Sequence, residues 1–341
     1  MEITEQFKLG KKFIEGLKPS DKVILVHHKD ADGTYSAAIT ASAFAKLNKK
    51  IHKIIPGTTE KSHEIIKSVK GYKKIIIVDI GIELLLADLN EMDAEILYID
   101  HHLVPEKNIG SNITYINPRL FEPEIYQPAT YVVYKFFSSI TNISDKEWLA
   151  VIGTIGDYGF EDCRDLLDKY IKVNEKRDIW GTKYGKAAII TIGATAEIGF
   201  DELLNILVEA ENFDELVKNK NIVDGYKKYE TLYEKDKETF VKNSESIGKL
   251  VFSAATYKLE RVGSSIATET STKNPDKIIF LLEKVDDFYK IHARYQKGGI
   301  SLGELLRKMG IGGGHRQAAG GKIKITALKE FKNHLIKELK L

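Results

Sequence analysis

The stretch VILVHHKDADGTYSAA at residues 23–38 begins with an apolar run, turns polar, and ends in small residues. The apolar run predicts a buried strand, and the pattern of residues 34–47 predicts a helix soon after it. Asp30 and Asp32 lie between the two, and Gly33 permits a sharp turn into the helix. The stretch therefore predicts a strand, a turn and a helix, with both carboxylates at the carboxyl end of the strand.

Short apolar runs alternate with amphipathic stretches through the first 160 residues. The runs IIIV at 75–78 and ILYI at 96–99 predict further strands, and residues 60–69 predict a helix. Strands that alternate with helices are typical of an α/β domain built on a parallel sheet.

The rest of the chain follows other patterns. Residues 226–246, YKKYETLYEKDKETFVKNSES, are densely charged and predict an exposed connecting helix. The later runs KLVFSAATY, KIIFLLEKV and FYKIHARYQ predict strands, and a helix at 302–309 and a glycine-rich loop follow them. We therefore expect a parallel-sheet α/β domain over residues 1–185, a helical connector over 186–247, and a smaller α+β domain over 248–341.

Composition limits the partners and the compartment. Lys+Arg 51 against Asp+Glu 49 gives a formal net charge of +2, so a nucleic-acid partner would need a local basic groove. No stretch approaches the roughly 18 apolar residues of a membrane span, and the amino terminus lacks a signal-peptide core. The single Cys163 excludes internal disulfides and a multi-cysteine zinc site. We expect a cytoplasmic protein.

Acidic residues and histidines follow three predicted strands and one predicted helix. They are Asp30, Asp32, Asp79, Asp100, His101, His102 and Asp157. Small residues surround Asp157, and we interpret the apolar stretch before it as a closely packed helix. Because the carboxyl ends of parallel strands lie at one edge of a sheet, we expect these side chains to gather there.

Several carboxylates in one dry cleft repel one another unless cations neutralise them. Carboxylate and imidazole ligands without thiolate suit Mn²⁺ or Mg²⁺ better than structural Zn²⁺. Two such ions about 4 Å apart, bridged by one carboxylate, generate a hydroxide nucleophile and hold a phosphate. A single Asp after a strand is more often a loop or helix-cap residue, so the hypothesis of a metal-dependent phosphoesterase depends on all four clusters together.

With these motifs the chain resembles the DHH phosphoesterases that carry a DHHA1 domain, and among them archaeal RecJ-like exonucleases, over nearly its whole length. The resemblance implies a DHH catalytic domain at residues 1–185 and a DHHA1 substrate-binding domain at 248–341 that closes a cleft. It also implies two manganese ions, with Mg²⁺ as the alternative. The implied ligands are His28, Asp30, Asp32, Asp79, His101 and Asp157. Asp79 would bridge the ions, and His28 is preferred to His27 as the upstream ligand.

The resemblance also implies catalytic roles for two residues of the DHH motif. His102 would contact the substrate phosphate or stabilise the leaving oxygen. Asp100 would orient the neighbouring imidazole.

The segment GIGGGHRQAAGG at residues 310–321 is a candidate substrate loop. Its glycines allow backbone N–H groups to converge on an anion, although glycines alone more often mark a flexible turn. Arg294 lies two residues after His292, on the same face of the predicted strand. The resemblance favours phosphate binding by Arg294, and a solvated strand arginine is the alternative. The predicted substrate-binding residues are Arg294, Gly312, Gly313, Gly314, His315 and Arg316.

The function that the resemblance implies is a manganese-dependent exonuclease acting on single-stranded RNA or DNA, with a leaning toward RNA and 3′–5′ cleavage. Some archaeal relatives associate with a replication or helicase protein. A nano-RNase, a 3′,5′-bisphosphate nucleotidase or a cyclic-dinucleotide phosphodiesterase is the alternative with the same metal site. A non-catalytic replisome scaffold is the third interpretation, and the presence of every expected acidic ligand argues against it.

Overall fold

The computed structural model describes residues 3–103, 108–172, 179–259, 262–297, 299–314 and 316–340. The chain divides into two compact units, Met1–Lys227 and Lys228–Leu341. No helix in these described ranges is both long enough and apolar enough to cross a membrane.

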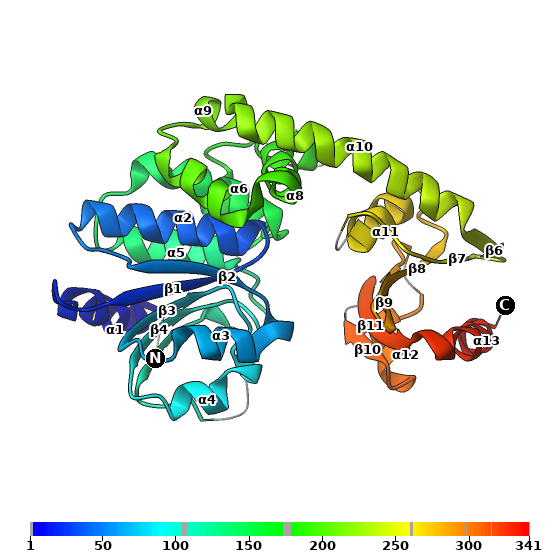
Figure 1. Ribbon diagram of the computed structural model, residues 1–341, viewed down its shortest axis with the longest axis horizontal. Coiled ribbons are helices and arrows are strands. Elements are labelled where there is room, and N and C mark those ends of the chain that lie inside the picture. Colours follow the sequence, from blue (N-terminus) through cyan, green and yellow to red (C-terminus); the bar gives the residue numbers. More distant parts are fainter. Residues whose placement is uncertain are drawn as a thin grey trace. The chain divides into compact units, whose positions relative to one another are not determined.

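The first unit is built on a parallel five-stranded sheet with the order β2-β1-β3-β4-β5 (Figure 1). Its strands are β1 (Val23–His28), β2 (Lys53–Gly57), β3 (Lys74–Val78), β4 (Glu95–Ile99) and β5 (Ile113–Ile116). This confirms the predicted α/β fold. The strand order reverses at β1, which has β2 on one side and β3 on the other. In open α/β sheets such a switch point opens a crevice at the carboxyl ends of the strands, where ligands bind.

Helices cover both faces of this sheet, so its central strands β1, β3 and β4 are buried on both sides. Figure 1 shows α2 and α5 on one face and α3 and α4 on the other. The helices of the first unit up to the connector are α1 (Ile3–Gly16), α2 (Ala31–Lys46), α3 (Ser62–Val69), α4 (Leu86–Asn90), α5 (Ala129–Ser138), α6 (Glu147–Gly156) and α7 (Arg164–Leu167). Along β1, Leu25 belongs to one hydrophobic core and Ile24 and Val26 to the other. Burial on both faces explains why these strands are continuous apolar runs in the sequence.

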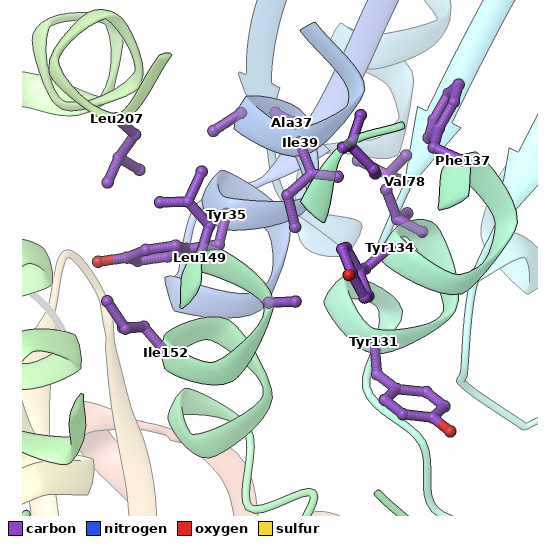
Figure 2. Close-up of a cluster of buried hydrophobic side chains, with 14 of the residues drawn as sticks. Tyr35, Ala37, Ile39, Val78, Tyr131, Tyr134, Phe137, Leu149, Ile152 and Leu207 are labelled. Atoms are coloured by element: carbon purple, nitrogen blue, oxygen red, sulfur yellow. The ribbon is translucent and has the colours of Figure 1, made fainter. Parts of the chain in front are cut away.

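Small residues bring α2, α5 and α6 close together behind the sheet. Figure 2 shows Tyr35 of α2 in the same cluster as Leu149 and Ile152 of α6. A Cβ atom added to Gly156 would lie 2.5 Å from the Cβ atom of Ala31, so only glycine allows this approach. The helix predicted before Asp157 is confirmed as α6, and its close packing has this steric origin.

The segment predicted as a connector holds three helices, which are α8 (Lys183–Glu209), α9 (Phe213–Lys218) and α10 (Lys220–Lys242). Much of α8 packs into the core of the first unit, through side chains such as Leu203 and Leu207. Gly199, with φ +77°, interrupts its helical backbone. The predicted charged helix is α10, which begins six residues earlier than predicted. The boundary between the two compact units lies within this helix, at Lys227 and Lys228.

The second unit has a mixed six-stranded sheet, β10-β11-β9-β8-β7-β6, in which only β7 and β8 are parallel. Its elements after α10 are β6 (Ser244–Ile247), β7 (Leu250–Ala255), α11 (Val262–Lys273), β8 (Ile278–Val285), β9 (Phe288–Arg294), α12 (Leu302–Lys308), β10 (Gly312–Gly314), β11 (Ala318–Lys324) and α13 (Leu328–Leu339). Phe252, Phe280 and Phe331 belong to its core. The predicted α+β fold is confirmed.

Gly312–Gly314 differ from their prediction, because they form the edge strand β10 rather than a loop. A Cβ atom on Gly312 would lie 2.1 Å from the carbonyl oxygen of Gly320. The glycines therefore allow two backbones to approach closely in an antiparallel pair.

Candidate metal centre

The predicted ligands of the first unit gather at the carboxyl edge of its sheet. His28 ends β1, Asp79 follows β3, and His101 follows β4 by two residues. Asp30 caps α2 and Asp157 caps the end of α6. Since β1 and β3 flank the switch point, the centre lies at the position where ligands bind in open α/β sheets.

His28, Asp30 and Asp79 form one group whose ligand atoms all lie within 4.8 Å of one another. The Nδ1 atom of His28 lies 2.5 Å from Oδ2 of Asp30 and 3.7 Å from Oδ2 of Asp79. These three side chains present imidazole nitrogen and carboxylate oxygen toward a common point.

A second group consists of Asp32, His101 and Asp157, whose ligand atoms also lie within 4.8 Å of one another. The Nε2 atom of His101 lies 3.7 Å from Oδ2 of Asp32 and 3.5 Å from Oδ2 of Asp157. The same nitrogen lies 3.3 Å from Oδ1 of Asp79. Asp79 thus presents one oxygen to each group, the geometry of a bridging carboxylate.

The backbone of Asp79 is held in the left-handed region, with φ +60°. Its amide still donates to the carbonyl oxygen of Ile99 at 3.0 Å, in continuation of the sheet. The side chain is 1% exposed, and its Oδ2 has no hydrogen-bond partner. A buried, unsatisfied oxygen on a strained backbone is costly to stability, which points to a functional role.

Hydrogen bonds hold the carboxylates of the second group in place. Asp32 accepts from the backbone N–H groups of Ala129 at 2.7 Å and Thr130 at 2.6 Å, and from the Thr130 hydroxyl. These N–H groups open α5, whose positive N-terminal end favours a carboxylate. Tyr126 donates its hydroxyl to Oδ2 of Asp157 at 2.7 Å.

The carboxylates of the centre repel one another when no cation is bound. Burial, together with the charges of Asp32 and Asp30, raises the pKa of Asp79 well above its usual value. Burial and the charge of Asp32 raise the pKa of Asp157 to about 8, and burial and the charge of Asp30 raise the pKa of Asp32 to about 6. A divalent cation removes this repulsion, and the oxygen and nitrogen donors fit Mn²⁺ or Mg²⁺.

The two histidines of the DHH motif differ in charge. Burial and the neighbouring His102 lower the pKa of His101 to about 4, so His101 is a neutral imidazole, the form that binds metal. Burial opposes a charge on His102, but Asp100 outweighs it and raises the pKa of His102 to about 9. Asp100 lies 2.6 Å from Nδ1 of His102 and also accepts from Tyr115 at 3.2 Å. His102 is therefore a fixed, protonated donor at neutral pH.

His28, and not His27, belongs to the cluster among the residues that the structure describes. His27 is fully buried, and its Nδ1 lies 2.8 Å from the carbonyl oxygen of His28. Neighbouring residues of a strand point to opposite faces of the sheet, so only one of the two can reach the centre.

The predicted substrate-binding residues belong to the second unit, and the metal groups belong to the first. Arg294 is half-buried and donates to the hydroxyls of Thr268 at 3.0 Å and Ser264 at 2.8 Å. Both hydroxyls belong to α11, which also packs on His292 through Gly263, so His292 and Arg294 share a face as predicted. Arg316 is exposed, and His315 lies outside the described residues.

Two residues of the centre, Tyr126 and Arg119, were not predicted from the sequence as site residues. The centroid of the Tyr126 ring lies 5.4 Å from that of His101, and the Arg119 guanidinium carbon lies 5.7 Å from the Tyr126 centroid. Arg119 follows β5, a strand that the sequence did not predict, so no local signal identified this arginine.

Known proteins resemble this chain in sequence and in fold. The single-stranded-DNA-specific exonuclease RecJ of Haemophilus influenzae is 28% identical over 116 residues, which are 31% of this chain and 20% of that protein. The chain therefore matches about a fifth of that relative's length. RecJ from Thermus thermophilus, solved in complex with Mn²⁺, has a TM-score of 0.74 at 19% identity, covering 97% of this chain and 53% of that one. The pGpG-specific phosphodiesterase PggH from Vibrio cholerae has a TM-score of 0.58 at 17% identity, and the match covers 94% of this chain and 99% of that one. At these identities the two structures show a shared fold.

Two family models match the two units in turn. The model of the DHH family, N-terminal domain, matches residues 22–154, which include all five strands of the first sheet. The model of the DHHA1 domain matches residues 249–341. Together the matches span about two thirds of the 341 residues. The first unit therefore contains a DHH-family N-terminal domain, and the second unit contains a DHHA1 domain.

Proposed function

We propose that this protein is a divalent-metal-dependent phosphodiesterase that degrades single-stranded RNA or DNA as an exonuclease. The observation that carries the proposal is the position of Asp79, which offers one carboxylate oxygen to each of two ligand groups. Two groups that share a carboxylate are the arrangement that hydrolytic two-metal sites use on phosphate esters.

The proposed metal ligands are His28, Asp30, Asp32, Asp79, His101 and Asp157. Mn²⁺ or Mg²⁺ bound there would supply a deprotonated water near neutral pH and Lewis-acid stabilisation of the phosphate. Neighbouring residues of the chain would hold these ligand side chains in fixed positions. The N-terminal end of α5 orients Asp32, and the Tyr126 hydroxyl orients Asp157.

His102 is the proposed proton donor to the leaving oxygen. It is held by Asp100 at 2.6 Å and is 42% exposed, so it can reach a substrate. Its raised pKa, about 9, keeps it protonated at neutral pH, as general-acid catalysis requires. Asp100 is fully buried and acts through His102 as a positioning residue.

The second unit is proposed to bind the strand through Arg294, Gly312–Gly314, His315 and Arg316. Arginine binds phosphate with two parallel hydrogen bonds, and Arg316 is an exposed arginine beside the glycine strand β10. The exonuclease RecJ of Haemophilus influenzae is described as single-stranded-DNA-specific, which supports a single-stranded substrate here.

A small-nucleotide phosphodiesterase is the second candidate, and one observation favours it. PggH, which is described as a pGpG-specific phosphodiesterase, shares the fold of this chain with a TM-score of 0.58. The same fold in an enzyme described as acting on a dinucleotide supports this candidate.

The proposal is tested with end-labelled RNA and DNA of about ten nucleotides and with dinucleotides, each in Mn²⁺, in Mg²⁺ and in chelator. We expect a ladder of products from one labelled end of the decamers, and no product in chelator. Turnover of dinucleotides alone would select the second candidate. The absence of turnover on every substrate with both metals would refute a phosphodiesterase.

The matched variants are Asp79→Asn and Asp88→Asn. Both remove one carboxylate, but Asp88 is exposed on α4 and belongs to none of the ligand groups. Asp79→Asn should lose at least about 10²-fold in kcat, as expected when a group that stabilises the transition state is removed. Asp88→Asn should keep wild-type activity. Equal activity of the two variants would remove Asp79 from the mechanism.

A further inference from the structure

We propose that Arg119 is a further catalytic residue of this centre, whose guanidinium group donates hydrogen bonds to non-bridging oxygens of the phosphate being cleaved. This inference rests on the proposed function, because it needs a phosphate at the metal centre. It assigns a fixed positive charge to a site that otherwise consists of acids and imidazoles.

The backbone of Arg119 is tied to the DHH motif. Asn117 follows β5, and its side-chain oxygen accepts from the N–H of Arg119 at 2.9 Å. The same side chain donates through Nδ2 to the carbonyl oxygen of His102 at 2.9 Å. Asn117 is fully buried, so it fixes Arg119 relative to His102.

The side chain of Arg119 lies over an aromatic ring of the centre. Its Nε donates to the carbonyl oxygen of Ile125 at 3.1 Å, and its guanidinium carbon lies 5.7 Å from the centroid of the Tyr126 ring. The centroid of that ring lies 5.4 Å from the centroid of the His101 ring, in an edge-on arrangement. Its hydroxyl donates a hydrogen bond to Oδ2 of Asp157 at 2.7 Å. One aromatic ring therefore separates the guanidinium group from two proposed metal ligands.

The hydrogen-bonding capacity of Arg119 is largely unused within the described part of the chain. Its hydrogen bond to Ile125 engages Nε, and no described carboxylate lies within ion-pair distance of its terminal nitrogens. Half-buried arginines are normally paired, because desolvating an unpaired charge is costly. A guanidinium held on its Nε side and by its aromatic contact presents two terminal nitrogens in the fork that suits a phosphate.

The competing explanation is structural, with Arg119 serving only to hold the segment of Tyr126 in place. Two substitutions separate the explanations. Arg119→Lys keeps the charge over the ring but loses the fork, and Arg119→Met keeps much of the side-chain bulk but loses the charge. Arg164→Met is the matched control, since Arg164 is an exposed arginine of the same unit that pairs with Glu161.

The first measurement is kinetic, on the substrate that the wild-type protein cleaves. Arg119→Met should lower kcat by about 10²–10³-fold, the usual loss when one donor to a developing negative charge is removed. Arg119→Lys should fall between Arg119→Met and wild type, and Arg164→Met should match wild type. The melting temperature and the Mn²⁺ affinity from calorimetry should stay at wild-type values in both Arg119 variants, which a merely structural role would not allow.

The second measurement needs no turnover, and it separates this inference from the proposed function. Inorganic phosphate is titrated into the Mn²⁺-loaded protein, and we expect Arg119→Met to bind it at least about tenfold more weakly than wild type. If the wild-type protein binds phosphate in this way but cleaves no phosphodiester, the proposed function fails, whereas phosphate binding by Arg119 stands. Wild-type phosphate affinity in Arg119→Met, no phosphate binding by the wild-type protein, or a loss of Mn²⁺ affinity in the variants overturns the assignment.

Discussion

Asp79, at the proposed metal centre, combines features that each lower the stability of the fold. It combines a left-handed backbone, near-complete burial and a carboxylate oxygen without a hydrogen-bond partner. Each feature disfavours the folded state, and the surrounding acids add repulsion. A cation bound at the proposed centre would give this oxygen the partner that it lacks.

We expect Asp79→Asn to be more stable than wild type in chelator, by about 1–2 kcal/mol, because the neutral amide avoids the burial cost and the repulsion that raise the pKa of Asp79. Asparagine tolerates the left-handed backbone, so the strand end should keep its conformation. In Mn²⁺ the order should reverse, since only the wild-type protein gains stability from the bound metal. Denaturant unfolding with and without Mn²⁺ measures both states, with Asp88→Asn as control. A less stable Asp79→Asn protein in chelator would contradict this account.

The stability of the metal-free protein should rise as the pH falls from 8.5 to 6.5. The pKa of Asp157 is raised to about 8 by burial and by the charge of Asp32, so the folded protein takes up a proton that the unfolded chain does not. The raised pKa of His102, about 9, acts in the same direction, because stability from its charge is lost as the pH rises through that value. Below pH 6.5 the burial-lowered pKa values of His27 and His101, about 4, oppose the trend.

Thermal unfolding at pH 8.5 and 6.5 in chelator checks this prediction. With Mn²⁺ the trend should disappear or reverse, because protons compete with the metal for the same ligands. A metal-free protein that loses stability as the pH falls over this window would show that the acids do not repel one another as their positions indicate.

At the scale of elements, the centre depends on how closely α2 approaches β1. Asp30 caps α2 by accepting from the N–H of Gly33 at 2.9 Å. A Cβ atom on Gly33 would lie 2.4 Å from the carbonyl oxygen of His28, so the turn has no room for a side chain. The helix start and the strand end are thereby held in contact, and both carry proposed ligands.

We expect Gly33→Ala to destabilise the protein by about 1–3 kcal/mol and to weaken Mn²⁺ binding, because α2 must move away from β1. Gly16→Ala is the control: a Cβ atom at this helical position would meet nothing within 4 Å, so alanine should be neutral or stabilising. Calorimetric titration with Mn²⁺ and denaturant unfolding measure the two effects. Unchanged Mn²⁺ affinity in Gly33→Ala would show that the turn does not position the ligands.

At the scale of the whole molecule, the proposed metal ligands and the predicted strand-binding residues belong to different units. His28, Asp79 and Asp157 lie in Met1–Lys227, and Arg294 and Arg316 lie in Lys228–Leu341. A strand-binding residue outside the metal centre adds binding energy only for substrates long enough to reach it. Variants in the two units should therefore have different consequences.

Arg316→Ala should lower kcat/KM for single-stranded decamers by about tenfold and leave dinucleotide cleavage and Mn²⁺ affinity unchanged, because it removes one phosphate contact. The dependence of decamer binding on salt should also become shallower by about one unit of slope. Lys329→Ala, which removes an exposed positive charge on α13, is the control for net charge. Equal effects of the two substitutions, or an equal loss on dinucleotides, would exclude a specific strand contact by Arg316.

Much of the first unit could be predicted from the sequence, because short stretches of consecutive residues mark its strands and the acids at their ends. An apolar run that is buried on both faces is recognisable wherever it occurs, and an acid that ends such a run marks an edge of the sheet. The runs before His27, Asp79 and Asp100 all became strands, β1, β3 and β4. The less apolar β2 and β5 had no such run, and β2 contains Pro56 at an edge of the sheet.

The sequence by itself determined which chemical groups stand at the strand ends, because strand periodicity and the order of residues are properties of the local chain. Only the tertiary structure decided that β1 lies between β2 and β3, that Asp79 offers an oxygen to both ligand groups, and that Gly312–Gly314 pair as a strand. It also brought Arg119 to Tyr126 and Tyr126 to Asp157. The physical reason is that these contacts join residues distant in sequence, through strand pairing and side-chain packing that no local pattern encodes.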